Sequence, residues 1–132
     1  MSENIESTHI AVIGAGPGGY AAAFLAADFG LGVTIIDPAE NPGGVCLHRG
    51  CIPSKTLLHA AKVINEADEA SNWGIDFKKP KIDVDKLRTW KDDVVQKLTG
   101  GLGKLTDQRK IRRIRGHARF LDASTIEIHK HE

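Results

Sequence analysis

The sequence is poor in the residues that mark nucleic-acid-binding and disulfide-rich proteins. Aromatic residues make up 5% of it, and only two of its 132 residues are cysteine. The 18 lysines and arginines nearly balance the 17 aspartates and glutamates, and neither sign forms a long block. One short basic cluster runs from Arg109 to Arg115 without interleaved aromatics. We therefore interpret this cluster as a solvated strand and turn, and we expect no nucleic-acid partner.

Long apolar segments are also missing. Residues 1–8 are polar, and the apolar run from His9 to Ala15 is short and ends in glycines, so nothing resembles a signal peptide. No stretch reaches the roughly 18 apolar residues that cross a bilayer. We therefore expect a cytoplasmic protein without a membrane partner. Two cysteines in that compartment are more often catalytic or redox-sensing than structural.

The first third of the chain has the pattern of a strand, a turn, a helix and a second strand. The β-branched run Ile10 to Ile13 leads into a glycine-rich turn, after which Tyr20 to Asp28 is alanine-rich and favours a helix. Val33 to Asp37 is a second β-branched run, apolar enough for a buried parallel strand. The length allows one folding unit or part of one. This pattern predicts an α/β fold.

The rest of the chain predicts two helices and a few strands. A loop over Pro38 to Gly44 precedes a helix that starts near Pro53. A second, amphipathic helix over residues 84–98 is expected to close at the glycines 100, 101 and 103. Short apolar runs between residues 111 and 128 favour two or three strands, the last of which reaches the end of the chain. So few strands would leave one sheet edge unpaired, so we expect the chain to be the front part of a larger domain.

The glycine-rich turn has the spacing of a dinucleotide-binding site, Gly14-x-Gly16-x-x-Gly19. Gly14 permits the tight turn after the strand, and Gly16 lets the backbone approach a pyrophosphate closely. Gly19 allows the helix and the strand to pack together. Phosphates would then bind the backbone N–H groups at the start of the helix. Pro17 suits the first helical turn, which needs no N–H donor. Asp37, 18 residues after Gly19, is placed to contact a ribose hydroxyl.

The two cysteines lie five residues apart, in Cys46-Leu47-His48-Arg49-Gly50-Cys51. Residues five apart in a helix have Cα atoms about 8 to 9 Å apart, whereas a disulfide needs less than about 7 Å. A paired segment therefore cannot be regular helix, and Gly50 would let it tighten before Pro53 starts the helix. A thiolate near that helix start would be stabilised by the helix dipole. A zinc site with His48 would need a fourth ligand, and two inert buried thiols remain an alternative.

Residues Gly43 to Lys55 resemble the redox signature of the pyridine nucleotide disulfide oxidoreductases, and Trp90 to Leu102, with Leu98-Thr99-Gly100-Gly101-Leu102, resembles the bacterial dihydrolipoamide dehydrogenases within that family. The resemblance implies a Rossmann-like FAD-binding domain, three-layered with a mostly parallel sheet. Residues 1–132 would form the N-terminal part of that domain. The NAD-binding and interface domains of such enzymes would lie outside this chain.

The resemblance also implies roles for individual residues. Cys46 would be the interchange thiol that attacks the disulfide form of the substrate, and Cys51 the thiolate beside the flavin ring. Lys55 would stabilise negative charge on the reduced ring. The FAD contacts implied by the motifs are Gly14, Gly16, Pro17, Gly19, Asp37, Gly44, Val45, Cys46, Lys55 and Ala118, with no metal. Relatives usually have glutamate in place of Asp37, so its shorter side chain would have to reach the ribose.

The implied reaction is the oxidation of dihydrolipoamide, carried by the acyltransferase component of 2-oxo acid dehydrogenase complexes, with electrons passing through the cysteine pair and FAD to NAD. The whole enzyme would be a homodimer whose His-Glu base comes from the interface domain. Three alternatives remain: another disulfide reductase of the family, such as glutathione or mercuric reductase, a non-catalytic FAD-binding fragment, or an NAD-dependent Rossmann enzyme in which the cysteines have no role.

Overall fold

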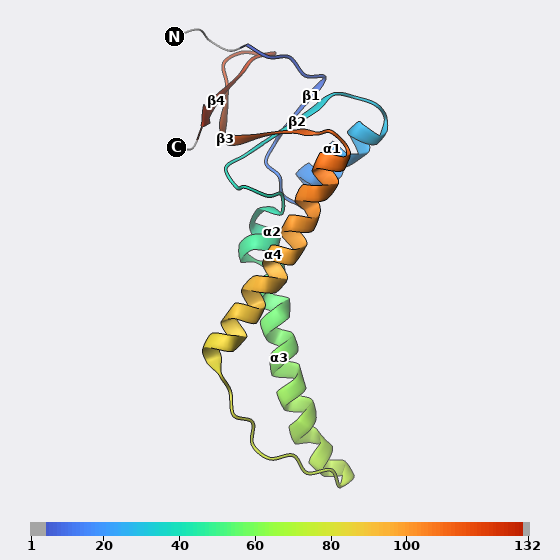
Figure 1. Ribbon diagram of the computed structural model, residues 1–132, viewed down its shortest axis with the longest axis vertical. Coiled ribbons are helices and arrows are strands. Elements are labelled where there is room, and N and C mark those ends of the chain that lie inside the picture. Colours follow the sequence, from blue (N-terminus) through green and yellow to red (C-terminus); the bar gives the residue numbers. More distant parts are fainter. Residues whose placement is uncertain (1–4, 131–132) are drawn as a thin grey trace. The chain divides into compact units, whose positions relative to one another are not determined.

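The computed structural model describes residues 5–130 and has an α/β architecture (Figure 1). The chain forms two compact units. The sheet unit comprises the residues up to Gly44 and from Thr99 onward, and the helical unit comprises Val45–Leu98. In chain order the elements are β1 (Ile10–Ile13), α1 (Pro17–Asp28), β2 (Val33–Asp37), α2 (Gly44–Arg49), α3 (Cys51–Glu69), the 3-10 helix η1 (Ala70–Trp73), α4 (Val84–Gln108), β3 (Arg112–Phe120) and β4 (Ile126–Lys130).

The sheet has the strand order β1-β2-β3-β4. β1, β2 and β3 are parallel, and β4 is antiparallel to β3. β3 changes partner along its length: up to Arg115, which lies opposite Asp37, it pairs with β2, and from Gly116 it pairs with β4. A Cβ on Gly116 would lie 2.5 Å from the carbonyl oxygen of His129, so the position where β3 changes its pairing partner requires glycine. The predicted α/β class and mostly parallel sheet are confirmed.

The core of the sheet unit lies between α1 and the sheet. α1 contacts β1 and β2, and the methyl group of Ala23 on α1 is fully buried. Val33 and Ile35 of β2 and Ile111 before β3 complete this core. Each such aliphatic side chain contributes about 1.5–3 kcal/mol when fully buried. All residues from Val33 to Ile36 are buried, as the near-continuous apolar run of a central parallel strand predicts.

The expected end of the second long helix is wrong. α4 does not close at the glycines but continues through them to Gln108. Glycine is less favourable than alanine in a helix by about 1 kcal/mol, which a long helix with buried contacts further along can absorb. Thr106, one turn past Gly103, is fully buried, and its hydroxyl donates to the carbonyl of Leu102 at 2.8 Å. Packing beyond the glycines therefore outweighs their low helix propensity.

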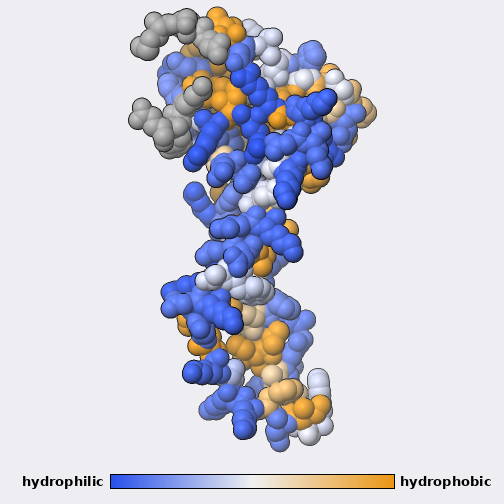
Figure 2. Space-filling model, viewed as in Figure 1, coloured by the Kyte–Doolittle hydropathy of each residue, from blue (hydrophilic) through white to orange (hydrophobic). Residues whose placement is uncertain are grey.

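The helical unit contains α2 from Val45 onward, α3, η1 and α4 as far as Leu98. The rings of His59 on α3 and Trp90 on α4 lie 6.4 Å apart between centroids. Apolar side chains are exposed in this unit, on the helices and in the loop between η1 and α4; they include those of Leu57, Leu58, Val63, Trp73, Ile75, Phe77, Ile82 and Val84. Figure 2 shows orange, apolar surface on one face of the molecule. No helix within residues 5–130 combines the length and apolar character needed to cross a membrane.

Two helical glycines predict opposite effects on stability. No heavy atom lies within 4 Å of a Cβ added to Gly100, so Gly100→Ala should raise the free energy of unfolding by about 0.5–1 kcal/mol. A Cβ on Gly19 would lie 1.9 Å from the backbone oxygen of Gly14, so Gly19→Ala should lower it by about 1–3 kcal/mol. Urea denaturation followed by circular dichroism measures both. Destabilisation by Gly100→Ala would contradict the open space beside α4.

Candidate functional site

The glycine turn follows β1 directly. Gly14 has φ +93°, in the left-handed region that favours glycine, and its N–H donates to the carbonyl of Ile36 at 2.8 Å. Gly19 sits against the backbone of Gly14, as the predicted contact of helix and strand requires. α1 begins at Pro17 with Gly16 as its N-cap, and no side chain caps this end. The free N–H groups of the first turn are therefore open to an anion.

Gly44 lies against this turn. Its φ is +58°, and a Cβ there would lie 2.6 Å from the Cα atom of Gly16. The N–H of Gly43 donates to the carbonyl of Ala15 at 2.8 Å. The loop that follows β2 thus packs backbone to backbone on the glycine turn. The structure brings Gly44 to the turn, while its predicted contact with FAD stays a prediction.

Asp37 also holds the glycine turn. Its Oδ2 accepts a hydrogen bond from the Ala15 N–H at 2.7 Å, and its Oδ1 accepts one from the Ala39 N–H at 2.8 Å. The sequence predicted a ribose contact for this carboxylate, and the two backbone hydrogen bonds were not foreseen. Each carboxylate oxygen can accept a further hydrogen bond, so the ribose contact stays a prediction.

An open hollow of about 430 Å³ lies beside Asp37. Two arginines of β3 that sequence reasoning had interpreted as solvated are part of its lining. Arg113 donates to the Glu40 carbonyl at 3.1 Å, and Arg115 donates to the Pro38 carbonyl at 3.0 Å. The alternation of arginines along a strand was the available signal, because side chains two apart share a face.

Ala118 lies further along β3, where it pairs with Ile128 of β4. Its side chain is half-buried, and it is three residues beyond Arg115 in the same unit as the glycine turn. The predicted contact of its backbone with the adenine end of FAD stays a prediction.

The cysteine segment in the helical unit is a broken helix. α2 ends at Arg49, and α3 begins at Cys51. A Cβ on Gly50 would lie 3.0 Å from the Val45 carbonyl oxygen and 3.5 Å from the Cys46 Cα atom. Gly50 therefore lies close against the backbone of Val45 and Cys46 at the break. The segment has the break at Gly50 that pairing of the cysteines would require, while the pairing itself stays a prediction.

The predicted start of the following helix is wrong by two residues. Cys51, and not Pro53, is the first residue of α3. Pro53 is tolerated inside the first turn because the N–H groups there have no partner within the helix. Cys51 consequently lies at the amino end of α3, where the helix dipole favours negative charge.

Both cysteines are free thiols, with Cys46 half-buried and Cys51 exposed. The hydrogen bond between the two side chains raises the pKa of Cys46, and desolvation and the charge of the Cys51 sulfur raise it further. The backbone N–H of Cys51 and the ammonium of Lys55 lower the pKa of Cys46, with smaller effects. Cys46 therefore holds its proton more firmly than an ordinary thiol does.

The structure thus brings Cys46, Cys51 and Lys55 together in the helical unit, next to Val45, whose side chain is 71% exposed. Two thiols in hydrogen-bond contact can exchange with a disulfide. Within residues 5–130, no group of three or more histidine, cysteine, aspartate or glutamate side chains is placed to hold a metal ion.

Comparison with known proteins identifies the family of the chain. The family model described as pyridine nucleotide-disulphide oxidoreductase matches residues 8–132. The chain is 49% identical to the dihydrolipoyl dehydrogenase of Vibrio cholerae over 97% of its own length and 27% of that protein. It is 54% identical to the one of Buchnera aphidicola from Acyrthosiphon pisum, over 86% of the chain and 24% of that protein. It is 50% identical to the dihydrolipoyl dehydrogenase of Haemophilus influenzae, over 96% of the chain and 26% of that protein.

The chain spans about a quarter of the length of these curated relatives. The match nevertheless covers almost the whole chain, including the glycine turn and both cysteines. The chain therefore belongs to the pyridine nucleotide-disulphide oxidoreductase family.

Proposed function

We propose that this chain is the N-terminal part, residues 1–132, of the FAD-binding domain of a dihydrolipoamide dehydrogenase. The enzyme would oxidise dihydrolipoamide to lipoamide and reduce NAD. The observation that carries this proposal is the hydrogen-bonded pair Cys46 and Cys51 with Lys55 beside it. The three relatives described above are dihydrolipoyl dehydrogenases and support the same choice within the family.

The glycine turn fits the ADP half of FAD. A Cβ on Gly19 would press on the Gly14 oxygen, one on Gly44 would press on Gly16, and the uncapped start of α1 leaves N–H donors for a pyrophosphate. Asp37 would accept from the ribose hydroxyls, and the Ala118 backbone would meet the adenine. The remaining proposed contacts with FAD are made by Gly44, Val45, Cys46 and Lys55.

The cysteine pair would carry the dithiol chemistry. Starting from the Cys46–Cys51 disulfide, one substrate thiolate bonds to the Cys46 sulfur, and Cys51 leaves as a thiolate. The second substrate thiol loses its proton to a base and attacks the substrate sulfur bound to Cys46, so that lipoamide leaves as a disulfide and Cys46 takes the electron pair and a proton. Bound FAD supplies the two-electron acceptor that links this dithiol to NAD.

Cys46 would act as the interchange thiol and Cys51 as the thiolate beside the flavin. The raised pKa of Cys46 suits this division, because Cys46 keeps its proton until a base removes it. In the reverse direction the deprotonated Cys46 attacks lipoamide. The base would be the His-Glu pair that the family places on an interface domain of the partner in a homodimer. Lys55 would offset negative charge on the reduced ring.

The proposed setting is the cytoplasm, where the enzyme would serve the acyltransferase component of a 2-oxo acid dehydrogenase complex. Glutathione reductase and mercuric reductase are the second candidates, because the spacing of Cys46 and Cys51 suits them equally. Turnover with dihydrolipoamide and NAD, compared with glutathione disulfide and NADPH, separates the candidates. If the full-length gene product binds FAD but turns over neither substrate, the non-catalytic FAD-binding alternative is favoured.

Visible absorbance tests the flavin and the dithiol together. The purified chain, mixed with FAD and passed through gel filtration, should keep the flavin absorbance. Anaerobic dihydrolipoamide should then produce a new long-wavelength band, because the Cys51 thiolate would lie against the oxidised ring. The variant Cys46→Ser should show this band without reductant, and Cys51→Ser should never show it. A chain that loses all flavin on the column would count against the FAD assignment.

The pH dependence of Cys46 alkylation tests the thiol pair. Cys51→Ala removes the hydrogen bond and the charge that raise the pKa of Cys46, so the pKa should fall and the iodoacetamide rate profile should move to lower pH. Lys55→Met removes a cation that lowers this pKa, so the profile should move to higher pH. Mass spectrometry of the reduced chain gives the rate at Cys46. Shifts of both variants in the same direction would contradict the arrangement.

A further inference from the structure

The loop between β2 and α2, residues 38–43, is attached to the glycine turn on one side. The Asp37 carboxylate joins the Ala15 and Ala39 N–H groups, and the Gly43 N–H bonds to the Ala15 carbonyl. Pro42 is almost completely buried. Movement of this loop would therefore displace Ala15, in the middle of the proposed phosphate-binding turn.

The other side of the loop is attached to β3 and α4 by Arg113. Its Nη1 donates to the Glu40 carbonyl at 3.1 Å and to the Asn41 side-chain oxygen at 3.2 Å. Its Nη2 donates to Asp107 of α4 at 3.0 Å. Its side chain is 32% exposed, so these charge-assisted bonds are partly shielded from water.

Two further features reinforce this attachment. Arg115, opposite Asp37 in the parallel register, donates from Nε to the Pro38 carbonyl at 3.0 Å. A Cβ on Gly103 would lie 2.4 Å from the Asn41 side-chain oxygen, so α4 can approach Asn41 this closely only because residue 103 is glycine. The guanidinium groups of β3 thus bind carbonyls at both the beginning and the middle of the loop.

We propose that Arg113 and Arg115 are positioning residues that hold the loop of residues 38–43 and thereby fix the glycine turn for its dinucleotide ligand. This inference rests on the proposed function, since it takes that ligand to be the ADP half of FAD. Neither arginine is assigned a contact with the ligand. Their effect passes through Asp37 and Gly43 to Ala15.

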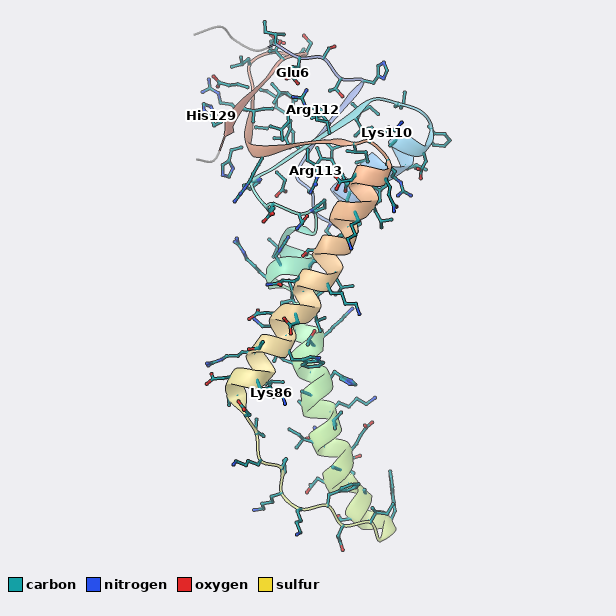
Figure 3. All side chains as sticks on the ribbon, viewed as in Figure 1. Glu6, Lys86, Lys110, Arg112, Arg113 and His129 are labelled. Atoms are coloured by element: carbon teal, nitrogen blue, oxygen red, sulfur yellow. The ribbon has the colours of Figure 1, made fainter. Side chains whose placement is uncertain are left out.

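The matched control is Arg112. It is the neighbour of Arg113 on β3, and Figure 3 shows the two on opposite sides of the ribbon. Its guanidinium pairs with Glu6 and not with the loop. Arg112→Met and Arg113→Met remove the same charge from the same strand and keep a similar aliphatic side chain. Arg115→Met is the second test variant.

Amide hydrogen exchange and ADP binding of the purified chain test the proposal. In Arg113→Met, and to a smaller extent in Arg115→Met, exchange at Ala15, Ala39 and Gly43 should accelerate about tenfold, since charge-assisted hydrogen bonds that close the loop are lost. Exchange at Ile35 in the core should stay unchanged, which a general loss of stability would not allow. ADP and FAD should bind about tenfold more weakly. Arg112→Met should match the wild type.

Each outcome decides a separate point. Unchanged exchange in Arg113→Met, or equal acceleration in Arg112→Met, would overturn the role of Arg113 in holding the loop. Faster exchange with unchanged ADP affinity would overturn the link from loop to ligand. A wild-type chain that binds neither ADP nor FAD would count against the proposed function and the ligand link together, and the exchange data would still decide whether the arginines hold the loop.

Discussion

The sheet unit depends on one close backbone approach, that of Gly44 to Gly16. A Cβ at residue 44 would lie 2.6 Å from the Cα atom of Gly16, and residue 44 has φ +58°, so no other residue type fits without strain. This contact closes the loop after β2 onto the turn after β1. It also fixes where the chain leaves the sheet unit, two residues before Cys46 in the sequence. The loop after β2 and the turn after β1 are therefore held together by one feature of the sheet unit.

The closed loop brings backbone N–H and carbonyl groups together, and charged side chains form hydrogen bonds with several of them. Asp37 accepts from two N–H groups, while Arg113 and Arg115 donate to the carbonyls of Glu40 and Pro38. A carboxylate beside a proposed pyrophosphate site would oppose a second negative charge. The two guanidinium groups line the same hollow as Asp37, and Arg113 is also ion-paired with Asp107 of α4. The hollow beside the turn therefore has charged groups of both signs in its lining.

The local patterns of the sequence predicted β1, β2 and the glycine turn, because each depends on residues close together in the chain. α4 was predicted too short, since the buried Thr106 and its neighbours beyond the glycines stabilise the helix through contacts that no local propensity contains. The attachment of the loop by Arg113 was missed for a similar reason. Its hydrogen bonds to Glu40 and Asn41 join residues 73 and 72 positions apart in the sequence, and they require the parallel register of β2 and β3.

The helix break at Gly50 bears on whether the two cysteines could form a disulfide. In a continuous helix, forming the disulfide would require unwinding a turn, because the Cα atoms would start about 8 to 9 Å apart. Here the break already exists with both thiols free, and Gly50 lies against Val45 and Cys46. Ser54 continues the helix by donating its N–H to the Gly50 carbonyl at 3.1 Å. The segment with free thiols therefore already has the helix break that pairing of cysteines five residues apart would require.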